Sequence, residues 1–338
     1  MGTIVHIDSF DHYTTVADKG WIGTGGFGVT GARNGNGLYA QGSWSGGYDG
    51  AVRRVWSGSA RAIVGFALRS ARRLAENIYF AEDAVANHLY LAWAGSGALE
   101  LRYGDNTLLG TTSSAWTGSN DKYVEVDILI ANSGGHARVY VNGVLEINFS
   151  GDTQNGGSAL VNQLNLVSGQ ITFEGAHNLI IDDLYIIDNA DAASTPLGDC
   201  KVECDFPSGN GNSSQLDGSD GNSTDNYLLV DEAANDGDTT YVESATVDEK
   251  DTYAFGDLAS ATGVVHAVQI NAFAKKTDSG ARGLKTVARL SGTEVDSSST
   301  SLGTSYAAAR DIRTTKPGGG SWTIADVNNA EFGVKVAA

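Results

Sequence analysis

Pairs in which asparagine or aspartate precedes glycine recur along this chain and limit the length of the regular elements between them. Such a pair accommodates the two positive-φ positions of a two-residue type I′ turn, which joins neighbouring antiparallel strands. The pairs begin at residues 34, 36, 49, 142, 155, 210, 217, 220 and 236. Glycine is abundant, with 44 residues, whereas only 3 prolines occur. This spacing predicts short strands joined by tight turns, and therefore an all-β fold.

The stretch HARVYVNGVLEINFSG, residues 136–151, shows the pattern most clearly. Apolar residues alternate with polar ones on both sides of Asn142 and Gly143, as expected for two strands that each bury one face. We predict a β-hairpin whose turn is formed by Asn142 and Gly143. The hairpin is expected to be part of the frame, with no chemistry of its own.

A chain of 338 residues is longer than one hydrophobic core usually serves, so two domains are expected. The polar segment 191–198, which contains Pro196, interrupts the strand pattern and is predicted to be a linker. Residues 1–190 then form one β-sandwich, and residues 199–338 form a second, smaller β-sandwich. In the second domain Thr323 can cap a short helix before a closing strand.

The charge balance excludes some partners. The chain has 40 acidic and 22 basic residues and a formal net charge of −18, which disfavours binding to a nucleic-acid backbone or an anionic membrane. No stretch approaches the ~20 apolar residues that span a bilayer. The first residues do not resemble a secretion signal, so synthesis in the cytoplasm is expected.

Acidic pairs on predicted strands are candidates for catalysis. Some β-sandwich glycosidases carry Glu-x-Asp-x-x-Glu on a strand, or a bulged form with the second Glu one place earlier, and Glu125 and Asp127 match the first two positions. Leu129 and Ile130 stand where the second glutamate would be needed, so the acid/base partner is missing. We expect an outward-facing acidic pair. Asp182 and Asp183 are adjacent on a strand, so they are predicted to point to opposite faces and not to act together.

The polar stretch 208–226 is predicted to be a long loop rich in Gly, Ser, Asn and Asp. Its carboxylates Asp217, Asp220 and Asp225 could hold a structural calcium ion, although the regular spacing of a calcium-binding loop is absent. The alternative is a solvated loop without metal, and no other cofactor is indicated.

The two cysteines, Cys200 and Cys204, lie in a segment that is predicted to be a strand. Residues four apart on a strand are ~13 Å from one another, which is too far for a disulfide. Two free thiols are therefore expected.

Tryptophan rings could form a platform for sugars. Trp44 and Tyr48 lie in a glycine-rich stretch, and Trp116 lies in the polar stretch SSAWTGSN. A flat ring can stack on the apolar face of a pyranose, whereas the alternative for each ring is a place in the core. These three residues are the candidate glycan-binding residues of the sequence.

Several motifs are similar to those of a known family. The opening IDSFDHY, the hairpin VYVNGVLEINFSG and the strand IIDDLYIID resemble the concanavalin A-like (laminin G-like) domain of structural proteins from tailed bacteriophages and prophages. The second half adds DGDTTYVES, DTYAFGDL, VHAVQINAFAKKTDSGAR and SWTIADVNNAEFGVKV. Together these motifs cover most of the chain in the order of that family.

The resemblance implies a structural protein on the outer surface of a virion, in the tail adsorption apparatus or on the head. Its first domain would be a concanavalin A-like jelly roll. Such a protein would not be an enzyme, would contact other virion proteins, would form a homo-oligomer such as a trimer, and could bind host surface glycans. The alternatives are a stand-alone carbohydrate-binding module and, on the basis of Glu125 and Asp127, a glycoside hydrolase.

Overall fold

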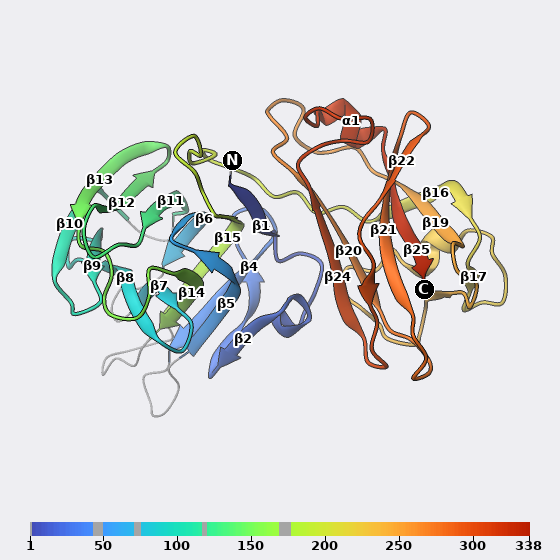
Figure 1. The fold of residues 1–338 in the computed structure, drawn as a ribbon, viewed down its shortest axis with the longest axis horizontal. Coiled ribbons are helices and arrows are strands. Elements are labelled where there is room, and N and C mark those ends of the chain that lie inside the picture. The colour runs from blue at the N-terminus through green and yellow to red at the C-terminus, as the bar shows by residue number, and fades with distance from the viewer. Residues whose placement is uncertain (1, 43–49, 71–75, 117–119, 169–176) are drawn as a thin grey trace. The chain divides into compact units, whose positions relative to one another are not determined.

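The computed structural model describes residues 2–42, 50–70, 76–116, 120–168 and 177–338 (Figure 1). The chain divides into two compact units, Met1–Val202 and Glu203–Ala338. Both units are built from strands, which confirms the predicted all-β class with a sandwich in each half. Within the described ranges, no helix is long and apolar enough to cross a membrane.

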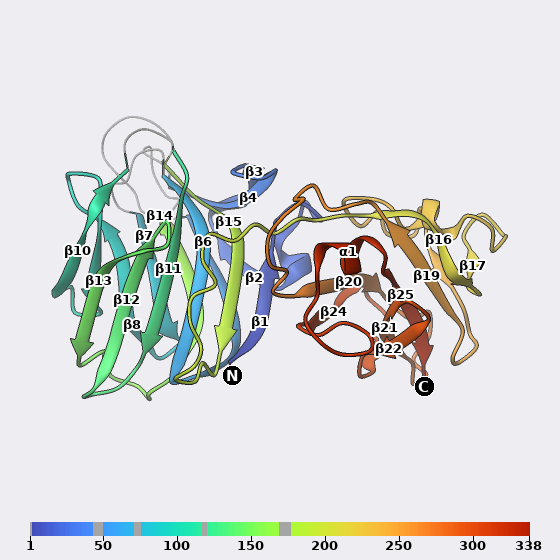
Figure 2. The same ribbon diagram turned by 90° about the horizontal axis from the view of Figure 1, so that it is seen from above.

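The first unit consists of two sheets that face each other (Figure 2). One sheet has eight strands in the part of the chain that the structure describes, and its neighbours pair antiparallel. Its strands, in spatial order, are β13 (Val144–Gly151), β12 (Gly135–Val141), β11 (Lys122–Leu129), β6 (Arg61–Ser70), β15 (His177–Asp188), β4 (Asn36–Gly42) and β3 (Gly26–Gly31), with β1 (Thr3–Asp8) also paired to β15.

The opposite sheet has seven described strands, also antiparallel. They are, in order, β10 (Leu108–Ala115), β9 (Ala98–Tyr103), β8 (Ala86–Trp93), β7 (Glu76–Glu82), β14 (Val161–Ser168), β5 (Gly50–Ser59) and β2 (Trp21–Thr24), and the short 3-10 helix η1 (Val16–Lys19) precedes β2. Apolar side chains of both sheets fill the space between them. Phe66 and Val126 from one sheet and Phe80 and Leu166 from the other are fully buried there. This layer is the main core of the unit.

A buried carboxylate stabilises the start of the chain. Asp8 is fully buried and accepts hydrogen bonds from the backbone N–H of Phe10 (3.0 Å), the Tyr13 hydroxyl (2.9 Å) and the Trp21 indole (3.0 Å). The ammonium group of Lys19 lies 3.1 Å from the same carboxylate. Burial acts to raise the pKa of Asp8, but the charge of Lys19 and the hydrogen bond with His6 prevail and lower it. The motif IDSFDHY is therefore structural.

The second unit contains a six-stranded sheet in its described residues, together with two smaller sheets. The large sheet runs β16 (Pro207–Ser214), β19 (Lys250–Phe255), β25 (Glu331–Ala337), β21 (Gly283–Leu290) and β22 (Thr293–Asp296), with β23 (Thr300–Ser301) on β21; the small ones pair β20 (Val268–Ala274) with β24 (Ala307–Arg313) and β17 (Asp217–Gly218) with β18 (Val242–Glu243). Ile270, Trp322 and Phe332 belong to its core. The helix α1 (Ile324–Asn328) begins after Thr323, which forms a capping box with Asp326, as the sequence indicates.

Two predictions for the second unit are wrong. The stretch 208–226 is not one loop, because residues 208–214 belong to strand β16, which pairs with β19. The stretch NYLLVD, whose apolar residues between polar ends predict a strand, begins instead with the 3-10 helix η2 (Asn226–Leu229). The side chain of Asn226 is buried and donates to Asp251 at 2.6 Å, and this contact fixes the turn. Tertiary contacts outweigh the local pattern in both places.

The segment 189–202, which includes the predicted linker 191–198, packs on the first unit. The backbone N–H of Gly198 donates to Glu125 at 2.8 Å, and that of Val202 donates to Asp183 at 2.8 Å. The segment thereby covers part of the outer face of the eight-stranded sheet. The boundary between the compact units follows it, at residue 202.

The cysteines lie in and beside this segment. Residues 199–206 form no strand, so the predicted strand there is wrong, but both thiols are free, as expected. Burial raises the pKa of Cys200 to about 12, which makes its thiol unreactive at neutral pH.

The hairpin turn is confirmed. Asn142 has φ 48° and Gly143 has φ 78°, so both central positions are left-handed, as a type I′ turn requires. The pairs that begin at residues 36 and 210 lie within strands instead. An Asn-Gly pair thus indicates a turn only where the flanking segments can pair with each other.

Replacing Gly143 by valine is expected to lower the free energy of unfolding by about 1–2 kcal/mol, because a β-branched residue is strained at positive φ. Gly31→Val is the matched control: Gly31 has ordinary φ, and a Cβ added there meets nothing within 4 Å. Chemical denaturation of both variants measures the difference. Equal stability of Gly143→Val and the parent protein would contradict the turn assignment.

Candidate functional site

The outer face of the eight-stranded sheet carries a group of charged side chains around Asp127. Asp127 on β11 is cross-strand partner of Arg138 on β12, and the neighbouring row places Arg61, Leu129 and His136 side by side. Because side chains alternate along a strand, all of these point away from the core. The site is therefore assembled by strand register.

Asp127 is buried and binds three basic side chains. Arg61 donates to both of its oxygens, at 2.9 and 3.0 Å, while His136 Nε2 and Arg138 Nη1 each lie 3.1 Å from it. Burial acts to raise the pKa of Asp127, but the hydrogen bonds from His136 and Arg61 prevail and lower it to about 2. The carboxylate is thus ionised at neutral pH and orients all three groups.

Arg61 also connects the sheet to the 189–202 segment. Its Nη2 donates to the carbonyl of Ser194 at 3.1 Å, and its Nη1 donates to the carbonyl of Asp191. Its Nε and Nη2 also donate to Asp127, so all three nitrogens of this guanidinium make hydrogen bonds. Arg61 is a structural residue that fixes one wall of the site.

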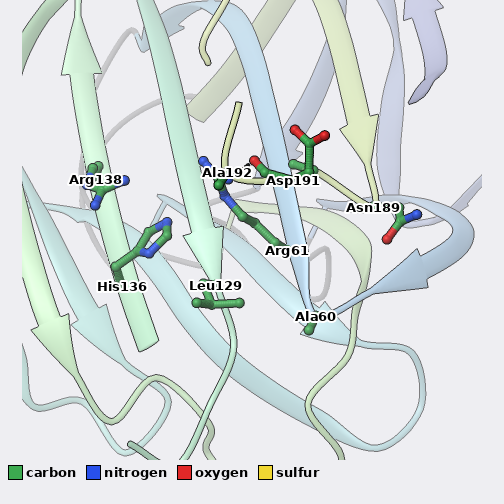
Figure 3. Close-up of a pocket in the computed structure, with 9 residues that line it drawn as sticks. Ala60, Arg61, Leu129, His136, Arg138, Asn189, Asp191 and Ala192 are labelled. Carbon is green, nitrogen blue, oxygen red and sulfur yellow. Dashed lines mark hydrogen bonds between the residues drawn. The ribbon is translucent and has the colours of Figure 1, made fainter. Parts of the chain in front are cut away.

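A pocket of about 510 Å³ opens beside these residues (Figure 3). Figure 3 shows His136 and Arg138 together on β12 at one side, and Asn189 and Asp191 at the other side, with Arg61 between them. Apolar groups contribute the remaining surface; they belong to Ala60, Leu129, Ala190 and Ala192. This volume matches the range of roughly 300–1,000 Å³ that is usual for small-molecule sites.

Glu125 takes no part in the pocket. It is buried, accepts hydrogen bonds from Tyr185 Oη (2.5 Å) and Gly198 N (2.8 Å), and burial raises its pKa. The predicted outward direction of Glu125 and Asp127 is correct, but their predicted exposure is wrong because the 189–202 segment and the basic side chains cover them. They do not form a carboxylate pair aimed at a cleft.

Asp182 and Asp183 lie together, contrary to the prediction. A bulge interrupts the register of β15 after Asp182, and Asp183 has φ 51°, which ends the alternation of faces. Both carboxylates bind Asn34: its backbone N–H donates to Asp182 at 2.8 Å and its side-chain amide donates to Asp183. Burial and the neighbouring charge of Asp183 raise the pKa of Asp182 to about 7.

The predicted glycan-binding residue Trp116 is in the core. Its side chain is 1% exposed, its indole N–H donates to the carbonyl of Leu68 at 3.1 Å, and its ring meets Trp93 edge to face. It cannot stack on a sugar, so this prediction is wrong. Trp44 and Tyr48 lie outside the described residues.

The predicted calcium ligands do not converge. Asp217 belongs to β17, Asp220 binds the side chain of Asn222 at 2.7 Å, and Asp225 precedes η2. Across the described parts of the chain, no group of three or more His, Cys, Asp or Glu side chains is arranged to hold a metal ion.

Comparisons with known proteins place the fold only. A scan against protein-family models finds no matching family. A search of curated proteins finds no match.

Solved structures that resemble about half of this chain include carbohydrate-binding and carbohydrate-active proteins. A sialidase has a TM-score of 0.39 at 14% identity, covering 54% of this chain and 19% of its own. A mutant of the alginate lyase Aly36B in complex with alginate trisaccharide has a TM-score of 0.43 at 12% sequence identity. The match covers 54% of this chain and 98% of the lyase chain. The lectin UEA-II complexed with galactose has a TM-score of 0.38 at 9% sequence identity. The match covers 55% of this chain and 99% of the lectin chain. At these sequence identities and TM-scores, no residue of this chain is assigned a role from these structures.

One prediction is corrected by this finding. The sequence led us to expect a protein that is not an enzyme, yet a sialidase and alginate lyases are among the structures with a similar fold. Both enzymes and a lectin are among these structures, so the expectation that the protein is not an enzyme is withdrawn.

Sequence reasoning missed Arg61, His136 and Arg138 as members of a site. His136 and Arg138 alternate with apolar residues on a predicted strand, so they could be assigned to the outer face. What could not be read from the chain is the register that brings Arg61, 66 residues away from Asp127, onto the same carboxylate.

The raised pKa of Asp182 predicts a pH dependence of stability. Between about pH 4 and pH 7 the folded state keeps a proton on Asp182 that the unfolded state releases, so the free energy of unfolding falls as pH rises. In Asp182→Asn the free energy of unfolding should fall less between pH 5 and pH 8 than in the parent protein. Urea denaturation with a chelator present measures this fall. The exposed turn residue Asp152 supplies the control, Asp152→Asn, which should follow the parent. Identical pH profiles for Asp182→Asn and the parent would refute the assignment.

Proposed function

We propose that the first unit binds carbohydrate in the pocket between β12 and the 189–202 segment. The observation that carries the proposal is the pocket itself, in which polar groups face one another across a partly apolar surface. The Asn189 side chain is exposed and makes no hydrogen bond to any described residue, and Arg138 is 35% exposed. These groups can reach sugar hydroxyls.

The chemistry of a sugar ring matches this arrangement. Hydroxyl groups need both donors and acceptors, and the pocket offers a guanidinium, an imidazole, an amide and the carboxylate of Asp191. The C–H groups of the ring need apolar contact, which Leu129 and the alanine methyl groups supply. A volume of about 510 Å³ accommodates one or two sugar residues.

A binding experiment tests the pocket directly. Arg138→Ala should weaken binding of a glycan identified on an array by about tenfold, because a charge-assisted hydrogen bond is lost. Arg102→Ala is the matched control, since Arg102 lies on the seven-stranded sheet, where it binds Glu100. Calorimetry gives the affinities, and the same mixtures are assayed for cleaved product. Loss of binding in Arg102→Ala alone would show that the glycan binds at the seven-stranded sheet and would contradict the proposed pocket. A soluble, folded protein that binds nothing on the array would defeat the proposal.

We also propose, from the sequence resemblance, that the chain is displayed on a tailed-phage virion after synthesis in the host cytoplasm, as a homo-oligomer that contacts other virion proteins. Repeated copies would convert weak contacts with host glycans into strong attachment through avidity. Labelled antibody should decorate purified particles in electron micrographs. Particles without label, although the protein is present in the infected cell, would contradict this placement.

A further inference from the structure

The two sides of the pocket differ in charge. His136 and Arg138 project from the same strand, two residues apart, and Asp127 beneath them is the carboxylate that both bind. Asp127 also neutralises Arg61, so a single negative charge is shared by three basic groups. This side of the pocket is therefore an electropositive spot in a chain whose net charge is −18.

The guanidinium of Arg138 keeps hydrogen-bond donors that bind no described residue. Its Nη1 binds Asp127 and its Nε lies 3.4 Å from Asn148 Oδ1, whereas its Nη2 donates to no described residue. The side chain is about one-third exposed, and the strand pairs on both sides of β12 hold its backbone. An exposed guanidinium edge that is already fixed in place can bind an oxyanion through parallel hydrogen bonds at low entropic cost.

The other acidic group that lines the pocket lies away from Arg138. Asp191 lies on the opposite side from Arg138 in Figure 3. Its Oδ1 accepts from the backbone N–H of Ala193 at 3.1 Å and from the Ser194 hydroxyl at 2.8 Å, so the carboxylate is held within its own turn. An anion beside Arg138 would thus lie on the side of the pocket away from Asp191, while the exposed side-chain amide of Asn189 can reach hydroxyls.

We infer that the pocket recognises an anionic saccharide, whose carboxylate or sulfate group binds Arg138. This inference rests on the proposed function, since it names the class of sugar that the same pocket selects. Arg61 positions the wall and Asp127 orients Arg138. The neutral part of the sugar lies toward Leu129 and Asn189.

The test compares ligands that differ only in charge. Calorimetry measures the affinities of oligouronate trisaccharides and of the same trisaccharides after chemical reduction of the carboxyl groups to alcohols, and a sulfated and a desulfated oligosaccharide form the second arm. The acidic member of at least one pair should bind about tenfold more tightly. Arg138→Gln should abolish the preference, Arg138→Lys should retain part of it, and Arg102→Gln should leave it unchanged. Melting curves establish that each variant is folded.

The outcomes separate this inference from the proposed function. If acidic and neutral members bind equally, or if Arg138→Gln keeps the preference, the pocket binds sugar without reading charge and the inference is wrong. If no member of either pair binds and the array is also negative, the proposed function fails as well. A preference for the uronate pair alone assigns the ligand as a carboxylate, and a preference for the sulfated pair alone assigns it as a sulfate ester.

Discussion

Buried carboxylates on the outer face of the eight-stranded sheet must find hydrogen-bond donors, and much of the first unit is arranged to supply them. An ionised group taken out of water without a partner costs several kcal/mol. Glu125 and Asp183 obtain backbone N–H groups from the 189–202 segment, and Asp127 obtains Arg61, which in turn binds two carbonyls of that segment. The sheet and the segment therefore stabilise each other.

The candidate site follows from the same constraint. The 189–202 segment provides one wall of the pocket, and the strands provide the other, so the groups that face the ligand are carried by hydrogen-bonded backbone. Asp127 orients His136 and Arg138 from below, and Arg61 holds the wall. Sites built in this way keep their geometry when the ligand arrives, which reduces the entropic cost of binding.

Strand β11 and the β12–β13 hairpin could be predicted from the alternation of their side chains, and β6 could be predicted from its continuous apolar run. Strand β14 lies within a sheet, and its buried Leu164 and Leu166 alternate with the polar residues Gln163 and Asn165. Strand β16 is composed of Gly, Ser, Asn and Pro, a composition that predicts a loop. It is a strand because it pairs with β19. Trp116 lies in a polar stretch and reads as exposed, but it is buried in the core.

The sequence by itself determined the all-β class, the presence of short strands joined by tight turns, and the type I′ turn at Asn142 and Gly143. These depend on side-chain alternation and on local backbone preferences, which act over a few residues. Only the tertiary structure decided that Arg61 meets Asp127, that Asp182 and Asp183 share Asn34, and that the polar segment after β15 covers a sheet. Those contacts depend on strand register and on a bulge, and both are set by how distant segments pack.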